Sequence, residues 1–254
     1  MIDLHSHLLP GVDDGSRTVA RSVAVLKHLA GLGLTDICLT PHLTASRAEH
    51  GVPAAYDSAF AALLAAAPPE VRLHRGAEIM LDRPFGRAAA ADRALTLGGS
   101  RYVLVEFPRI VPRDTVLAAL GQIAGTGLVP VLAHPERYSS CSVSAAHAWR
   151  SAGAKLQVDA TTVLMQTPRA DRARELISAG LADILAADNH GDDRSLAGAA
   201  AAIAAEGGQE QAALLTVGNP RAILEDRELT PVEPVALRST WTRRLRRFFE
   251  TGDA

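Results

Sequence analysis

The chain has 254 residues, of which 48% are hydrophobic and 4% aromatic, and its 26 basic and 28 acidic side chains leave a formal net charge of −2. This near-neutral balance excludes a protein that is drawn to nucleic acid by a general electrostatic field. No stretch approaches the ~20 apolar residues of a membrane helix, and two cysteines do not make a disulfide framework, so we expect a protein of the reducing cytoplasm.

Short β-rich runs alternate with alanine-rich amphipathic segments, which is typical of βα units, an α/β fold and a largely parallel sheet. In chain order the expected strands cover residues 2–7, 35–42, 71–80, 101–108, 128–137, 154–160 and 182–190. Expected helices between them include residues 17–33, 52–69 and 115–127. We expect Ser16 to cap the first of these helices and Gly33 to end it.

The βα pattern weakens after residue 226, so we expect an α/β domain over residues 1–226 and a tail over residues 227–254. Within the tail, three apolar residues recur at helical spacing with arginines between them: Trp241, Leu245 and Phe248, with Arg243, Arg244, Arg246 and Arg247. This segment, residues 239–250, could dock on its own domain or on a second subunit, or it could contact anionic lipid or a membrane-bound partner. The sequence leaves its role and the oligomeric state open.

Side chains that can bind a metal stand at or just beyond the ends of most expected strands. They are His5, His7, Asp14, His42, Glu78, Glu106, His134, Asp188 and His190. His5 and His7 alternate with apolar residues, so they project from one face of a strand, although a strand with one polar face would look the same. Because strand ends converge at one mouth in barrel-like α/β folds, their joint placement favours a common site.

Nine candidate ligands exceed what one ion uses, so we expect two to three divalent ions. Imidazole and carboxylate without thiolate suit Mn²⁺, Fe²⁺ or Zn²⁺. Three such ions would carry more charge than four carboxylates, which favours an anion such as phosphate. The other histidines fall in helices, loops or a strand body, and we interpret them as structural or surface residues: His28, His50, His74 and His147.

The motifs DLHSH, DDG, TPH, GAEI, VEFP, AHPER and DNH occur in this order over residues 3–190 and resemble the polymerase-and-histidinol-phosphatase (PHP) superfamily. The forms MIDLHSHLLPGVDDG, HPERY and GNPRAIL most resemble its bacterial tyrosine phosphatases, which are linked to capsular and exopolysaccharide export. The resemblance implies a distorted TIM-like (β/α)7 barrel, the PHP fold, with manganese the expected metal. By the same resemblance, His5, His7, Glu78 and Asp188 would hold a first ion; Glu78, Glu106 and His134 a second; and Asp14, His42 and His190 a third. Asp13 leaves the choice of ligand beside Asp14 open.

Arginine grips phosphate through a fork of N–H donors, and Arg137 in HPER is the expected phosphate-binding residue, with Arg194 as a second candidate. The alternative for Arg137 is a surface ion pair with Glu136. Cysteine-based phosphatase chemistry is excluded, because at C-x₅-R spacing His147 follows Cys141 and Thr44 follows Cys38.

We therefore expect a cytoplasmic, metal-dependent protein-tyrosine phosphatase. Its expected partner is the phosphotyrosine tail of a bacterial tyrosine autokinase that controls capsular and exopolysaccharide synthesis. Alternatives are a phosphatase for histidinol phosphate or another small phosphomonoester, a nuclease, and a non-catalytic phosphotyrosine-binding regulator. The lack of a basic stripe in the barrel portion disfavours nucleic acid, and a complete set of ligand residues disfavours the regulator.

Overall fold

The computed structural model describes residues 1–237. The strands are β1 (Ile2–Ser6), β2 (Asp36–Leu39), β3 (His42–Thr44), β4 (Arg72–Arg75), β5 (Glu78–Met80), β6 (Tyr102–Glu106), β7 (Val129–Ala133), β8 (Lys155–Asp159) and β9 (Ile184–Ala186). The helices are α1 (Val19–Gly31), α2 (Ala45–Ala48), α3 (Ala54–Ala66), α4 (Arg87–Ala91), α5 (Arg113–Ala124), α6 (Val143–Ser151), α7 (Ala160–Leu164), α8 (Pro168–Ser178), α9 (Ala197–Ala205), α10 (Gln209–Ala213) and α11 (Asn219–Leu224). Short helical turns cover η1 (Arg93–Leu95), η2 (Leu97–Gly99), η3 (Pro135–Arg137) and η4 (Leu214–Gly218).

All strand pairs are parallel, in a three-stranded sheet of order β1-β2-β4 and a six-stranded sheet of order β3-β5-β6-β7-β8-β9. The predicted strands 35–42 and 71–80 are each broken into two, at residues 40–41 and 76–77. Pro41 has no N–H to donate to a sheet, and a Cβ on Gly76 would lie 2.9 Å from Cys38 Sγ. The two breaks carry the chain from one sheet into the other.

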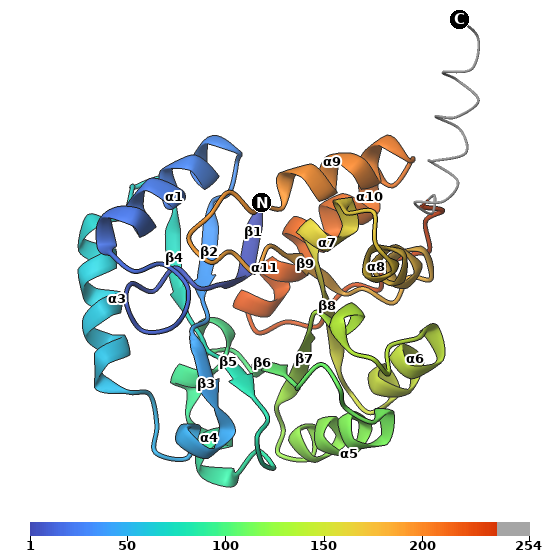
Figure 1. The fold of residues 1–254 in the computed structure, drawn as a ribbon, viewed down its shortest axis with the longest axis horizontal. Helices are drawn as coiled ribbons and strands as arrows, with labels where there is room; N and C mark the ends of the chain where they lie inside the picture. Colours follow the sequence, from blue (N-terminus) through green and yellow to red (C-terminus); the bar gives the residue numbers. More distant parts are fainter. Residues whose placement is uncertain (238–254) are drawn as a thin grey trace, which may run out of the picture.

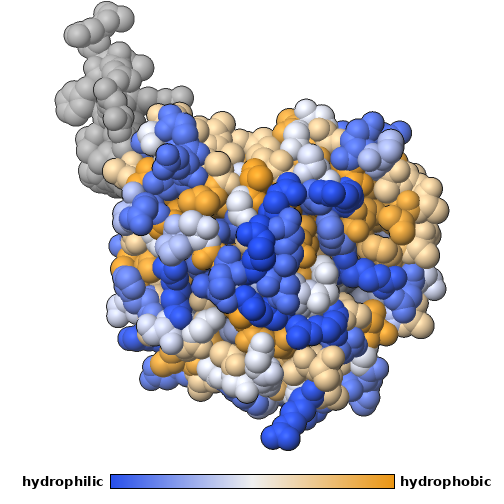
Figure 2. Space-filling model, turned by 180° about the vertical axis from the view of Figure 1, so that it is seen from behind, coloured by the Kyte–Doolittle hydropathy of each residue, from blue (hydrophilic) through white to orange (hydrophobic). Residues whose placement is uncertain are grey.

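The two ends of the strand series also meet. Ser6 at the end of β1 forms an isolated parallel bridge with Asn189, and the His7 N–H donates to the Asn189 carbonyl at 2.7 Å. The strands thus follow one another in chain order, with helices packed around their outside (Figure 1). Figure 2 shows one face of the molecule, on which hydrophobic groups are small and interrupted by hydrophilic side chains.

The predicted helices 17–33, 52–69 and 115–127 are present as the shorter α1, α3 and α5. The predicted cap of α1 is wrong: the Thr18 hydroxyl accepts from Arg21 N–H at 3.2 Å, whereas Ser16 Oγ donates to the Thr18 carbonyl. Gly33 follows the helix with a left-handed φ of 85°, as expected at a helix end.

Residues 227–237 lie against the body of the molecule. The Asn219 side chain exchanges two 2.9 Å hydrogen bonds with the Thr230 backbone, and Val232 and Val235 are buried in the main core. The domain boundary at residue 226 stays a prediction, and the arginine-rich segment 239–250 lies outside the described residues. Among residues 1–237, no helix has the length and apolar character to span a membrane.

Asp36 ties the start of β2 to β4. Its carboxylate accepts from Arg72 Nε at 2.8 Å and from Thr35 Oγ1 at 2.9 Å, and lies 2.9 Å from His74 Nε2. Burial opposes ionisation, but these hydrogen bonds, with Arg72 the foremost, outweigh it and lower the pKa of Asp36 to about 2. A carboxyl group whose pKa is lower in the folded than in the unfolded protein stabilises the fold above the unfolded value of about 3.9.

We expect Asp36→Asn to lower the free energy of unfolding by about 1–2 kcal/mol at neutral pH. The difference from the wild type should shrink as the pH falls from about 4 towards 2, because the wild-type carboxylate is then protonated. Denaturant unfolding of both proteins across this range measures the effect. A difference that stays constant with pH would contradict the assignment.

Candidate metal centre

The base of the site is built by the two histidines of the first strand and its extension. His5 Nε2 and His7 Nε2 lie 3.2 Å apart, close to the roughly 3.3 Å between two ligands of one tetrahedral ion at 2.0–2.1 Å. The other ring nitrogen of each histidine forms a hydrogen bond: His5 Nδ1 with Gln157 Oε1 at 2.9 Å, and His7 Nδ1 with Asp13 Oδ2 at 2.8 Å. Such partners fix the ring orientation that a metal ligand needs.

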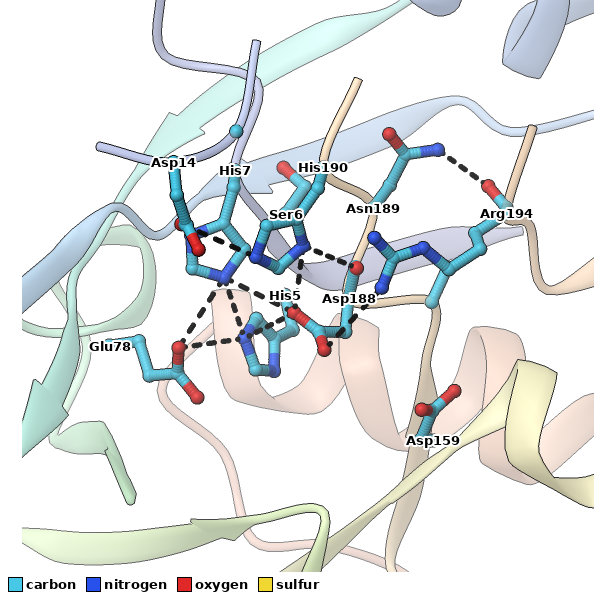
Figure 3. A network of polar contacts seen from close by, with 12 residues as sticks. His5, Ser6, His7, Asp14, Glu78, Asp159, Asp188, Asn189, His190 and Arg194 are labelled. Atoms are coloured by element: carbon cyan, nitrogen blue, oxygen red, sulfur yellow. Dashed lines mark hydrogen bonds and ion pairs between the residues drawn. The ribbon is translucent and has the colours of Figure 1, made fainter. Parts of the chain in front are cut away.

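Two buried carboxylates face these imidazoles, as Figure 3 shows. Glu78 Oε2 lies 3.2 Å from His5 Nε2 and 3.4 Å from His7 Nε2. Asp188 Oδ1 lies 3.3 and 3.2 Å from the same two atoms. The four side chains therefore surround one point. They come from distant parts of the sequence: β1 and the residue that follows it, the start of β5, and the loop after β9.

Glu78 also joins this point to a second group of side chains. Its Oε1 lies 3.0 Å from His134 Nε2, and its Oε2 lies 2.9 Å from His42 Nδ1. Glu106 Oε1 lies 3.3 Å from the same His42 nitrogen. His134 and Asp188 have positive φ angles, 34° and 49°. Left-handed backbone is uncommon for these residue types, and such strain clusters at functional sites.

Asp14 and His190 complete the outer side of the cluster. Asp14 Oδ1 lies 3.4 Å from His42 Nε2 and 3.5 Å from His190 Nε2. Asp13 is turned away from these atoms, since its carboxylate is engaged by His7 Nδ1 and the His42 N–H. The geometry thus favours Asp14 as the ligand and gives Asp13 the task of orienting His7.

All nine candidate ligands come together, in four overlapping groups whose ligand atoms lie within 4.8 Å of one another. The groups are His7, Asp14, His42 and His190; His5, Glu78 and His134; His5, His7 and Asp188; and His42, Glu78 and Glu106. His134 Nδ1 is buried without a hydrogen-bond partner among the described residues, whereas buried polar atoms are normally paired. The donor set, with imidazole and carboxylate atoms crowded at distances of about 3 Å, fits divalent cations.

The electrostatics of the cluster favour positive charge at its centre. Burial opposes the charged form of His42, but hydrogen bonds to Glu106 and Glu78 outweigh it and raise the pKa of His42 to about 10. Burial likewise disfavours ionised Asp188, yet the charge of His5 and the hydrogen bond to His7 hold the pKa of Asp188 far below its usual range. Carboxylates gathered in a buried site stabilise whichever cation lies between them.

The cluster opens into a cavity of about 730 Å³. Arg137 lines this cavity, and its Nη2 donates to Asp159 Oδ2 and Asp188 Oδ2 at 2.6 Å each. The alternative of a surface pair with Glu136 is wrong, because Glu136 is buried and its Oε1 accepts from the Asp159 N–H. Arg194 lies farther from the centre: its Nη1 is 3.7 Å from Asp188 Oδ2, and its Nε donates to Asp192.

Sequence reasoning missed several residues that shape the site. Gln157 and Asp159 end β8, so the rule that strand ends face the mouth could have found them. Arg47 of α2 and Arg109, in the loop after β6, also line the cavity, and neither belongs to a recognisable motif. The remaining histidines lie outside the candidate metal groups found in residues 1–237, as expected.

Residues 1–225 match the family model described as "Capsular polysaccharide synthesis, CpsB/CapC". The tyrosine-protein phosphatase YwqE of Bacillus subtilis (strain 168) is 31% identical over 140 residues, which are 54% of this chain and 55% of that protein. The tyrosine-protein phosphatase CpsB of Streptococcus agalactiae serotype III is 25% identical over 241 residues, covering 89% of this chain and 99% of that one.

The fold is also similar to a solved structure. It comes from crystal structures of YwqE from Bacillus subtilis and CpsB from Streptococcus pneumoniae, described as unique metal-dependent tyrosine phosphatases. The TM-score is 0.78 and the identity 25%, over 94% of this chain and all of the other. The similarity in fold thus extends over nearly the whole chain, and the family match over residues 1–225 includes all nine candidate ligands.

The turn that presents Asp13 and Asp14 depends on Gly15. A Cβ at this position would lie 2.0 Å from the His7 carbonyl oxygen and 2.5 Å from His7 Cβ. We expect Gly15→Ala to displace the turn and to weaken metal binding by at least about 10-fold, as loss of ligand support does elsewhere. Elemental analysis and metal titration of the folded variant measure this effect.

The matched control is Gly31→Ala in α1, where a Cβ meets nothing within 4 Å. This variant should retain the wild-type metal content. Unchanged metal affinity in Gly15→Ala would show that the turn does not support the site.

Proposed function

The chain belongs to the CpsB/CapC family of capsular polysaccharide synthesis proteins, and on that basis we propose that it is a metal-dependent phosphatase that hydrolyses phosphotyrosine in proteins. The observation that carries the proposal is the convergence of five imidazoles and four carboxylates at one cavity. Its relatives are named tyrosine-protein phosphatases, which favours this substrate over histidinol phosphate or a non-catalytic role.

The proposal assigns the ligands of two to three divalent ions. The first ion is held by His5, His7, Glu78 and Asp188; the second by Glu78, Glu106 and His134; and the third by Asp14, His42 and His190. The donor set suits manganese, with iron and zinc as alternatives. Bound ions would lower the pKa of water towards neutrality and stabilise negative charge on the phosphoryl oxygens.

We also propose that the strands form a distorted TIM-like (β/α)7 barrel of the PHP type. Two features support it: β2–β3 and β4–β5 each continue as one interrupted strand, and the ends of the series meet at the bridge between Ser6 and Asn189. In such a barrel, active sites lie where the C-terminal strand ends converge.

The residues around the metal ligands have separate tasks. Gln157 and Asp13 orient the imidazoles of His5 and His7. Arg137 is fixed by Asp159 and Asp188 through Nη2 alone, which leaves Nη1 to donate to a phosphoryl oxygen. Arg194, whose Nη1 lies 3.7 Å from Asp188 Oδ2, is a second candidate for binding the phosphoryl group. A tyrosine phenolate, with a pKa of about 10, departs without strong help from a general acid.

The proposed partner is the phosphotyrosine tail of a bacterial tyrosine autokinase, and the proposed location is the cytoplasm. The description of the family as capsular polysaccharide synthesis proteins supports a role in the control of that process. Contact of the basic segment 239–250 with the membrane or the kinase, and assembly into a homo-oligomer, stay predictions.

We expect His134→Ala and Asp188→Ala each to lower kcat/KM for a phosphotyrosine peptide by at least about 100-fold, because each removes a ligand and leaves buried charges unpaired. Phosphate release from the peptide measures this, with circular dichroism to verify folding. Wild-type activity in either variant would refute the metal-centre proposal.

Cys141→Ala is the control for these variants. The thiols of Cys38 and Cys141 are buried, and burial raises the pKa of each to about 12, so neither supplies a thiolate at neutral pH. The control should keep wild-type activity, and its inactivation would revive a thiol mechanism.

Treatment with a chelator is expected to abolish hydrolysis, and added Mn²⁺ to restore it, since the four carboxylates need a cation between them. Elemental analysis of the reloaded protein should find two to three ions per chain. Full activity in protein that retains less than one ion per chain would contradict the proposal.

A further inference from the structure

Basic side chains that the proposed function does not use lie in the metal cavity and beside it. Arg109 follows β6 and lines the cavity. Arg169 stands in the first turn of α8, after β8 and α7. Arg109 is exposed and Arg169 partly exposed, and within residues 1–237 neither side chain forms a hydrogen bond or an ion pair. Both guanidinium groups therefore keep all their donors available.

Three adjacent connections bring these arginines close together: Arg109 lines the cavity, and Arg169 lies near enough to Arg109 and Arg137 for their charges to act on it. β6, β7 and β8 are neighbours in the sheet, so the segments that follow them lie side by side. Two contacts tie these segments together: Ser139 N–H donates to the Arg109 carbonyl at 2.9 Å, and Arg172 donates to the Glu136 carbonyl at 2.8 and 3.0 Å. The position of the basic groups is therefore set by the backbone of three adjacent connections.

The positive charges repel one another. The pKa of Arg169 is lowered, first by burial and then by the charges of Arg137 and Arg109, with a smaller contribution from Arg172; the charge of Glu136 opposes this only in part. Nearby acids balance these charges only in part: Asp159 and Asp188 are engaged by Arg137, and Glu136 acts on Arg169 without forming an ion pair with it among the described residues. Repulsion between neighbouring positive charges raises the free energy of the unliganded protein, and a bound anion would reduce this repulsion.

From this arrangement we infer that Arg109 and Arg169 form a second anion-binding subsite, which binds a carboxylate of a residue flanking the phosphotyrosine. The inference rests on the proposed function and narrows its substrate class to acidic peptides. The phosphoryl group occupies the metal centre near Arg137, while the neighbouring acidic side chain reaches the two free guanidinium groups. Arginine suits this role because its planar fork matches a carboxylate.

The test compares two phosphotyrosine peptides that differ only in flanking residues, glutamate in one and glutamine in the other. The wild type should hydrolyse the glutamate peptide with the higher kcat/KM, and added salt should reduce the difference. Arg109→Gln and Arg169→Gln should each lower kcat/KM for this peptide about 5-fold, as expected for partly exposed charge pairs. Hydrolysis of the glutamine peptide and of p-nitrophenyl phosphate should not change.

Binding gives a readout that is independent of turnover. A fluorescent glutamate peptide with a non-hydrolysable phosphonate in place of the phosphate should bind each variant about 5-fold more weakly in an anisotropy titration. The matched control is Arg221→Gln in α11, whose charge acts on the Met1 amino group at the start of β1, the opposite end of that strand from His7. This control should bind and hydrolyse both peptides like the wild type.

The outcomes separate the two proposals. Equal kcat/KM for both peptides in an active wild type, or equal losses on all substrates in the variants, would overturn the subsite and leave the phosphatase function intact. No hydrolysis of any phosphotyrosine substrate by metal-loaded wild type would overturn the proposed function and the subsite with it. Selective loss on the glutamate peptide, in both turnover and binding, would support the subsite.

Discussion

The structure of the site depends on one buried carboxylate, that of Glu78. Its two oxygens lie within 3.4 Å of imidazole nitrogens of His5, His7, His42 and His134, which come from three other parts of the strand series. A carboxylate in this position is tolerable only with positive charge around it. Protons on the imidazoles or divalent ions among them supply that charge. The parallel strands hold the side chains close enough together for all of them to interact with it.

A surrounding layer of polar residues makes this arrangement rigid. Gln157, Asp13 and Asp159 each hold one functional group in place, and Asp188 contacts both the imidazoles and Arg137. The left-handed backbone at His134 and Asp188 has a cost that these contacts offset. Asp188 thereby links the candidate metal ligands to Arg137, and Arg109 lines the same cavity, an arrangement that suits a phosphoryl group with an acidic residue beside it.

Much of the fold could be read from local patterns. Period-two alternation at residues 2–7 and helical spacing at residues 17–33 reflect short-range geometry, so the positions of these elements are predictable. The expected strands 128–137 and 182–190 are too long, since β7 ends at Ala133 before the helical turn η3 and β9 covers only Ile184–Ala186. The predicted cap of α1 is wrong because Ser16 and Thr18 are both suitable N-cap residues; Thr18 directly precedes the helix, whereas the Ser16 hydroxyl is engaged by the Thr18 carbonyl and by Ser22. The breaks at residues 40–41 and 76–77 were missed, since they arise where the chain crosses from one sheet to the other.

The sequence by itself determined which residues could bind metal, because imidazole and carboxylate at successive strand ends carry that chemistry wherever the strands converge. Only the tertiary structure decided which of these residues face a common metal site and which orient a ligand. It turned Asp13 towards His7 and left Asp14 facing His42 and His190, a choice between adjacent carboxylates that no spacing rule makes. It also decided that Arg137 is held by two acids while Arg109 and Arg169 form no ion pair within residues 1–237, because ion pairing depends on which segments become neighbours after folding.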